Sequence, residues 1–114
     1  MLLELKVEVE DQLLADILTQ AVESASSYWA TFTQVKRATD LAVLSARVTE
    51  SEAAGKCRIA RVVMVEDIGR AMELLSKSRL PRRHLDNALS ESGWDDETAD
   101  VLLQLAVLGE VVYG

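Results

Sequence analysis

Apolar and charged residues alternate over the first ten positions of the chain, MLLELKVEVE. The apolar members fall on one side of this period-2 pattern: Leu3, Leu5, Val7 and Val9. Such alternation is typical of a strand with one buried face, so we expect a strand over residues 2–10.

A helical spacing replaces the alternation after Asp11, a residue type that commonly caps helices. Apolar residues then recur every three or four positions, at Leu14, Ile17, Leu18, Ala21, Val22 and Ala25. This spacing predicts an amphipathic helix with one apolar stripe. The serine-rich segment 24–27 should end the helix, because serine hydroxyls compete for backbone hydrogen bonds.

The middle of the chain is rich in β-branched, aromatic and other apolar residues, and we expect strands over residues 28–38, 41–49 and 57–65. Between the last two strands, the small and polar segment 50–56 contains Gly55, which indicates a turn. The two strands therefore predict a hairpin whose loop is longer than two residues.

Helical periodicity returns after residue 66, and it predicts three helices. Asp67 can cap the first, Pro81 suits the first turn of the second, and Gly93 can end the second. Asp95 or Asp96 can cap the third.

The acidic run at 95–97 is typical of a helix start, because carboxylates there can cap the helix and interact with its positive end. Gly109 should end that helix, and Val111, Val112 and Tyr113 predict a short terminal strand.

This order of elements predicts one α+β domain over residues 1–114. The simplest arrangement is a small antiparallel sheet packed on one face by the N-terminal helix and the C-terminal helices. A chain of 114 residues with 49% apolar residues can bury an adequate core without a metal or a disulfide.

Charge and cysteine content narrow the setting. The net charge is −7, from 12 basic and 19 acidic residues, which disfavours nucleic acid as a partner and favours solubility or a basic partner. Cys57 is the only cysteine, so the chain has no internal disulfide and no cysteine-based zinc site. No apolar run approaches the roughly 18 residues of a membrane span, and we expect a cytoplasmic protein.

Catalytic candidates are few. His84 is the only histidine, it lies among basic residues, and Asp86 cannot share its helical face, so we expect a helix-surface histidine. Cys57 opens a predicted strand and is expected in the core or at a strand edge. Motifs for phosphate loops, dinucleotides, zinc and serine nucleophiles are missing from the sequence. We therefore expect no enzyme, no metal and no cofactor.

Two groups of residues are candidates for binding. Tyr28 and Trp29 are adjacent, so one can enter the core while the other reaches the surface as an anchor. Packing of both in the core remains the favoured interpretation. Arg79, Arg82 and Arg83 form a local basic patch that could bind phosphate, RNA or an acidic protein surface, or simply face water.

Three stretches resemble a group of small bacteriophage- and prophage-encoded proteins. They are residues 14–30, ending in Tyr28-Trp29, residues 62–75, and residues 95–114, which contain Thr98-Ala99-Asp100, Leu103-Gln104 and the terminal GEVVYG. Before Tyr28 that group carries a glycine pair and an asparagine, where this chain has residues 24–27, SASS.

The resemblance implies a phage-encoded accessory protein acting in the host cytoplasm. We expect it to bind a host protein, such as a defence enzyme that it inhibits by placing an acidic surface against a basic groove. The alternative is a nucleic-acid- or nucleotide-binding module that uses Arg79, Arg82 and Arg83. Pairing of terminal-strand edges would give a homodimer.

Overall fold

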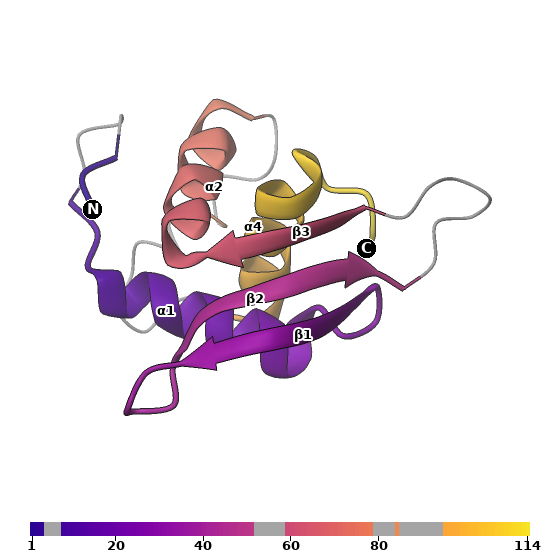
Figure 1. The fold of residues 1–114 in the computed structure, drawn as a ribbon. Coiled ribbons are helices and arrows are strands. Elements are labelled where there is room, and N and C mark those ends of the chain that lie inside the picture. Colours follow the sequence, from indigo (N-terminus) through magenta and orange to yellow (C-terminus); the bar gives the residue numbers. More distant parts are fainter. Residues whose placement is uncertain (4–7, 52–58, 79–83, 85–94) are drawn as a thin grey trace.

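The computed structural model describes residues 1–3, 8–51, 59–78, 84 and 95–114. Its elements follow in the order α1 (Asp11–Gln20), the π-helical turn η1 (Ala21–Ala25), β1 (Ala30–Arg37), β2 (Val43–Glu50), β3 (Ala60–Met64), α2 (Val65–Lys77) and α4 (Asp96–Leu108). The strands form one antiparallel sheet in the order β1-β2-β3, with the helices on one side of it (Figure 1). The predicted α+β class is confirmed. The hairpin predicted from residues 41–49 and 57–65 is confirmed as the antiparallel pair of β2 and β3.

The described residues of the N-terminal segment, 1–3 and 8–10, do not form the strand expected over residues 2–10. Its described residues make one isolated antiparallel bridge, between Leu2 and Glu8, and the Val9 amide donates to the Met1 carbonyl at 2.9 Å. These described residues thus pair with each other and not with the sheet. Leu3 and Val9 are buried, as predicted. Alternation therefore predicted the burial of Leu3 and Val9 but not the absence of a partner strand for the described residues, while Leu5 and Val7 lie outside the described part.

The first helix starts one residue earlier than predicted, because Asp11 is its first residue and not its cap, and its π-helical continuation ends within the expected serine segment. Glu10 precedes the helix without a side-chain capping bond, and Asp11 is its first residue. The helix widens into η1, where the Ser26 amide donates to the Ala21 carbonyl at 3.1 Å. This wider turn leads into the tight reversal that starts β1.

The ends of α2 and α4 show the predicted capping, with one correction. Asp67 does not precede α2 but lies inside its first turn, where its Oδ2 accepts the Met64 amide at 2.8 Å. Asp95 caps α4 by accepting the Thr98 amide at 2.9 Å. Gly109 ends α4 at a φ of 77°, the left-handed region in which glycine carries no Cβ penalty.

Two predicted elements near the C-terminus are not seen: one is contradicted, and the other lies outside the described residues. Residues 111–113 form no strand, which removes the basis of the expected homodimer through terminal-strand edges. The helix expected from Pro81 to Gly93 lies outside the described residues, apart from His84, which is helical.

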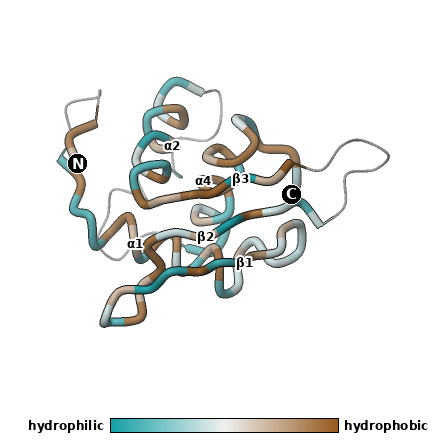
Figure 2. Tube along the Cα trace, in the orientation of Figure 1, coloured by the Kyte–Doolittle hydropathy of each residue, from teal (hydrophilic) through white to brown (hydrophobic). Residues whose placement is uncertain are grey.

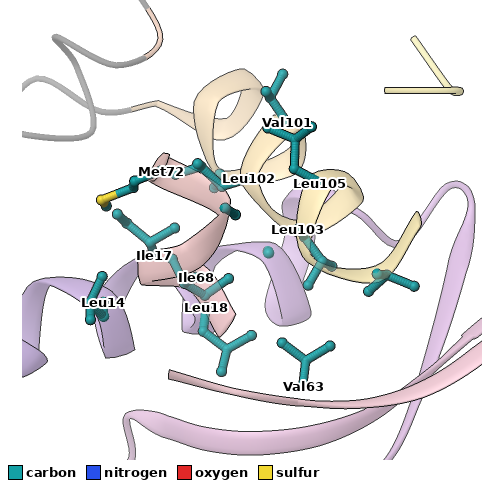
Figure 3. Packing of buried hydrophobic residues seen from close by; sticks show 14 of the residues in the cluster. Leu14, Ile17, Leu18, Val63, Ile68, Met72, Val101, Leu102, Leu103 and Leu105 are labelled. Carbon is teal, nitrogen blue, oxygen red and sulfur yellow. The ribbon is translucent and has the colours of Figure 1, made fainter. Parts of the chain in front are cut away.

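The core lies between the sheet and the helices. Side chains of α1, α2 and α4 meet there, as Figure 3 shows, together with Val63 from β3. Helix α4 is buried on nearly all sides, and Figure 2 shows its apolar character. None of the described helices is long and apolar enough to cross a membrane.

The opposite face of the sheet is covered by no described helix. The cross-strand register places small, polar or basic residues of β1 and β2 on it beside apolar residues of β3. These residues are Thr31, Thr33, Lys36, Ser45, Arg47, Thr49, Ala60, Val62 and Met64. We call them the open sheet face. It contains no carboxylate, although the chain carries a net charge of −7.

Candidate functional site

The most concentrated group of polar side chains surrounds Asp100, on the buried side of α4. Its Oδ1 accepts hydrogen bonds from Ser26 Oγ and from the Trp29 indole Nε1, both at 2.7 Å. Its Oδ2 accepts from Tyr28 at 2.5 Å and from Gln104 Nε2 at 3.0 Å. We call these five residues the Asp100 network. It joins α4 to the reversal between η1 and β1.

Gln104, one helical turn after Asp100, holds the C-terminal segment. Its Nε2 also donates to the Tyr113 carbonyl at 2.9 Å. Its Oε1 accepts the backbone amides of Val112 and Tyr113, each at 2.8 Å. A side-chain amide thus replaces the strand partner that the terminal residues were expected to find.

Tyr113 connects this segment to the sheet. Its ring stacks on Trp29, with centroids 5.4 Å apart and an angle of 11° between the planes. Its hydroxyl donates to Glu50 Oε2, and Glu50 Oε1 accepts the Ile59 amide at 3.0 Å. The C-terminal segment is therefore attached to α4, to the start of β1 and to the β2–β3 hairpin.

The electrostatics of these groups follow from their contacts. Burial and the hydrogen bond to Asp100 raise the pKa of Tyr28 to about 12, because both disfavour the tyrosinate. The hydrogen bonds from Tyr113 and Ile59 lower the pKa of Glu50. The hydrogen bond between Tyr113 and Glu50 also raises the pKa of the Tyr113 hydroxyl. Each shift keeps the group in the form that its neighbour requires.

The hydrogen bonds of the Asp100 network connect segments of the chain to one another. Both Asp100 oxygens and both ends of the Gln104 amide are used within the chain. Every buried side-chain nitrogen or oxygen among the described residues has a hydrogen-bond partner.

The structure separates the two aromatic candidates, so the favoured interpretation, in which both pack in the core, is wrong for Tyr28. Trp29 is buried at 2% exposure, while Tyr28 is 57% exposed although its hydroxyl turns inward to Asp100. The sequence missed the partners of both rings. One signal was present: Asp100 and Gln104 are polar residues four apart on the otherwise apolar face of the last helix.

His84 is the residue for which the surface prediction is wrong. It is 4% exposed, and its Nδ1 lies 3.3 Å from Thr98 Oγ1, the side chain at the start of α4. Its Nε2 lies 3.7 Å from Glu97 Oε1. Packing against the first turn of α4 buries the ring, and a local helical pattern could not show this contact.

The remaining candidates fall outside the described residues. They are Cys57 and the basic patch of Arg79, Arg82 and Arg83, so their predicted roles stay predictions. Within the described ranges, no group of three or more histidine, cysteine, aspartate or glutamate residues is placed to hold a metal ion.

A groove of about 340 Å³ lies between α2 and α4, beside β3. Ala71, Leu74 and Leu105 provide apolar lining, and Arg61, Asp67 and Arg70 provide charged lining. Arg61 donates to the Ala106 carbonyl at 3.0 Å, and Arg70 lies 3.5 Å from Asp67. The groove therefore combines an apolar surface with two guanidinium groups and one carboxylate.

Comparison of the chain with protein-family models, with curated proteins and with solved structures finds no match.

Proposed function

We propose that this protein is a non-enzymatic binding protein whose partner is another protein. The observation that carries the proposal is the open sheet face, because no described helix covers it and its β3 side is apolar. Val62 and Met64 are 52% and 50% exposed on that side. Clustered apolar side chains of this kind supply binding free energy when a partner covers them.

The polar side chains support binding over catalysis. The Asp100 network uses its hydrogen-bonding capacity on the protein itself, and this leaves recognition surfaces as the exposed chemistry. The acidic end of α4, at Asp95, Asp96 and Glu97, is the part that would meet a basic groove on a host defence enzyme. The open sheet face is the stronger candidate, because capping already accounts for Asp95. A phage setting and a host partner rest on the sequence resemblance alone.

Capture of a partner from nuclease-treated bacterial lysate, quantified by mass spectrometry, tests this function. We expect saturable capture of a protein by the parent chain and its loss with Val62→Asp. Leu41→Asp is the matched control, because Leu41 is 68% exposed in the connection between β1 and β2. Equal capture by both variants, or no specific capture, would contradict the proposed surface.

The same preparation tests the alternative of nucleic-acid binding. Partners that disappear on nuclease treatment, together with weaker DNA or RNA binding after replacement of Arg79, Arg82 and Arg83 by alanine, would favour the alternative. Binding that is unchanged by nuclease treatment and by the arginine replacements supports a protein partner.

A further inference from the structure

The two edges of the sheet differ in how well they are protected against an added strand. On β1, the register shifts between Thr33 and Lys36, Gln34 has a φ of 52°, and two cations follow at Lys36 and Arg37. Bulges and cationic side chains are features that discourage edge pairing. The β3 edge has a continuous register with β2 and one charged residue, Arg61.

The pairing of β2 with β3 fixes which β3 backbone groups point away from the sheet. The Glu50 amide donates to the Ile59 carbonyl at 2.9 Å, so alternate residues from Ile59 onward face β2. The peptide groups of Ala60 and Val62 therefore face the outer edge. No hydrogen bond joins these outward groups to another part of the described chain. The Met64 amide is already bound by Asp67.

The groove between α2 and α4 lies next to this edge, since Arg61 of β3 is part of its lining. A strand added to β3 would direct alternate side chains toward the groove, about 6.6 Å apart. An apolar side chain can cover Leu74, which is 46% exposed, and a carboxylate two residues away can meet the guanidinium groups. Arg70 is 69% exposed, and each of the two arginines makes one polar contact to the described residues, although it has five N–H donors.

From these observations we infer that an extended, acidic segment of a partner protein binds by strand addition to β3, with its side chains in the groove between α2 and α4. The inference rests on the proposed protein-binding function and names the chemistry of its partner. Backbone pairing with Ala60 and Val62 supplies affinity, while an apolar and an acidic side chain two residues apart, both on the groove side of the segment, supply specificity. Arg61 and Arg70 make the site selective for carboxylates within an otherwise acidic protein.

Short fluorescein-labelled peptides test the inference without knowledge of the natural partner. In the first, every second residue is valine and glutamate in turn, with threonine at the positions between, so that valine and glutamate side chains lie on the same side of the strand. The second has lysine in place of each glutamate. Fluorescence anisotropy should show saturable binding of the acidic peptide, weakened by rising salt, and at least about tenfold weaker binding of the basic peptide. Equal affinity for both peptides, or no binding of the acidic peptide, would overturn the inference.

Three variants locate the binding site. Arg70→Glu should weaken the acidic peptide by about tenfold or more, whereas Lys36→Glu, the same charge change on β1, should change its affinity by less than about twofold. Val62→Pro removes an outward amide and leaves the ladder to β2 intact, so it should also abolish binding. If that variant does not fold, the contrast between Arg70→Glu and Lys36→Glu decides. Equal effects at both positions would refute the site.

The outcomes separate this inference from the proposed function. Capture of a protein partner that needs Val62, combined with no peptide binding, would remove the groove and retain the function. Failure of both measurements would remove both. Sedimentation that shows a dimer disrupted by Val62→Pro would make a second copy the occupant of the edge and would overturn an acidic partner segment.

Discussion

Replacement of Asp100 by asparagine tests whether the Asp100 network stabilises the fold. The carboxylate accepts four hydrogen bonds, from Ser26, Tyr28, Trp29 and Gln104. An asparagine side chain of the same shape exchanges one acceptor oxygen for an NH2 group. In either orientation, that group faces two donors in place of the oxygen they require.

The neighbours cannot all adjust. A hydroxyl can rotate to accept, so Ser26 or Tyr28 can adapt, but the Trp29 indole is only a donor. Gln104 can present its oxygen to residue 100 only by giving up the amides of Val112 and Tyr113. Either orientation of the asparagine therefore leaves at least one buried donor without an acceptor.

The expected loss of stability follows from these unmet bonds. An unsatisfied buried donor costs about 1–3 kcal/mol, and loss of the charge-assisted bonds adds roughly 1–2 kcal/mol. We expect Asp100→Asn to lower the free energy of unfolding by about 3 kcal/mol, a substantial part of the roughly 5–15 kcal/mol typical of a domain. The corresponding decrease in melting temperature is roughly 10–15 °C.

Urea unfolding followed by far-UV circular dichroism measures this change. Asp96→Asn is the matched control, because Asp96 is exposed at the start of the same helix and binds Gln20 through an oxygen that asparagine retains. The control should lose less than about 1 kcal/mol. An Asp100→Asn variant within about 0.5 kcal/mol of the parent would refute the structural role of the network.

Three further predictions concern pH and backbone conformation. The folded-state pKa values of Glu50 and Asp95 are lowered. Their contribution to the free energy of unfolding is therefore present above their unfolded pKa values of 4.5 and 3.8, and it is lost as the pH falls through the folded values. Glu50→Gln should flatten the acid limb of a stability–pH curve, and an unchanged limb would contradict the contact with Tyr113. The pKa of Tyr28 is raised to about 12, so its contribution is present below pH 10 and is lost as the pH rises through about 12; ultraviolet titration of Tyr28→Phe against the parent should remove a late tyrosinate transition. Gly109→Ala should lower the free energy of unfolding, measured by thermal unfolding, by about 1 kcal/mol. The cost comes from the φ of 77° alone, because the added Cβ would have no neighbouring atom within 4 Å. A neutral substitution would show that the end of α4 relaxes.

Local patterns predicted most elements of this fold because local chemistry determines them. The Asp95 cap, the Gly109 end and the hairpin of β2 and β3 each depend on residues close in sequence. The terminal strand failed because a strand also needs a partner, and Gln104 supplies one only through tertiary packing. The same limit explains the N-terminal segment, where alternation gave burial without a neighbouring strand.

The candidate site was less predictable, because its contacts join residues far apart in the chain. Ser26 and Asp100 are separated by 74 positions, and Tyr113 and Glu50 by 63. Burial of His84 likewise depends on the start of α4, which no helical period around residue 84 can indicate. The sequence could name polar residues at unusual places but could not show that they meet.

The convergence of these residues also bears on what the sequence resemblance can mean. Its segments near the Tyr28-Trp29 pair, at Asp100, at Gln104 and at the C-terminus all meet in the Asp100 network and in the segment that Gln104 holds. A protein that needs this arrangement to fold must keep these residue types whatever it binds. Similarity confined to them would therefore be evidence of a common architecture. Evidence of a common partner would have to come from the β3 edge and the groove beside it, where Arg61 and Arg70 lie.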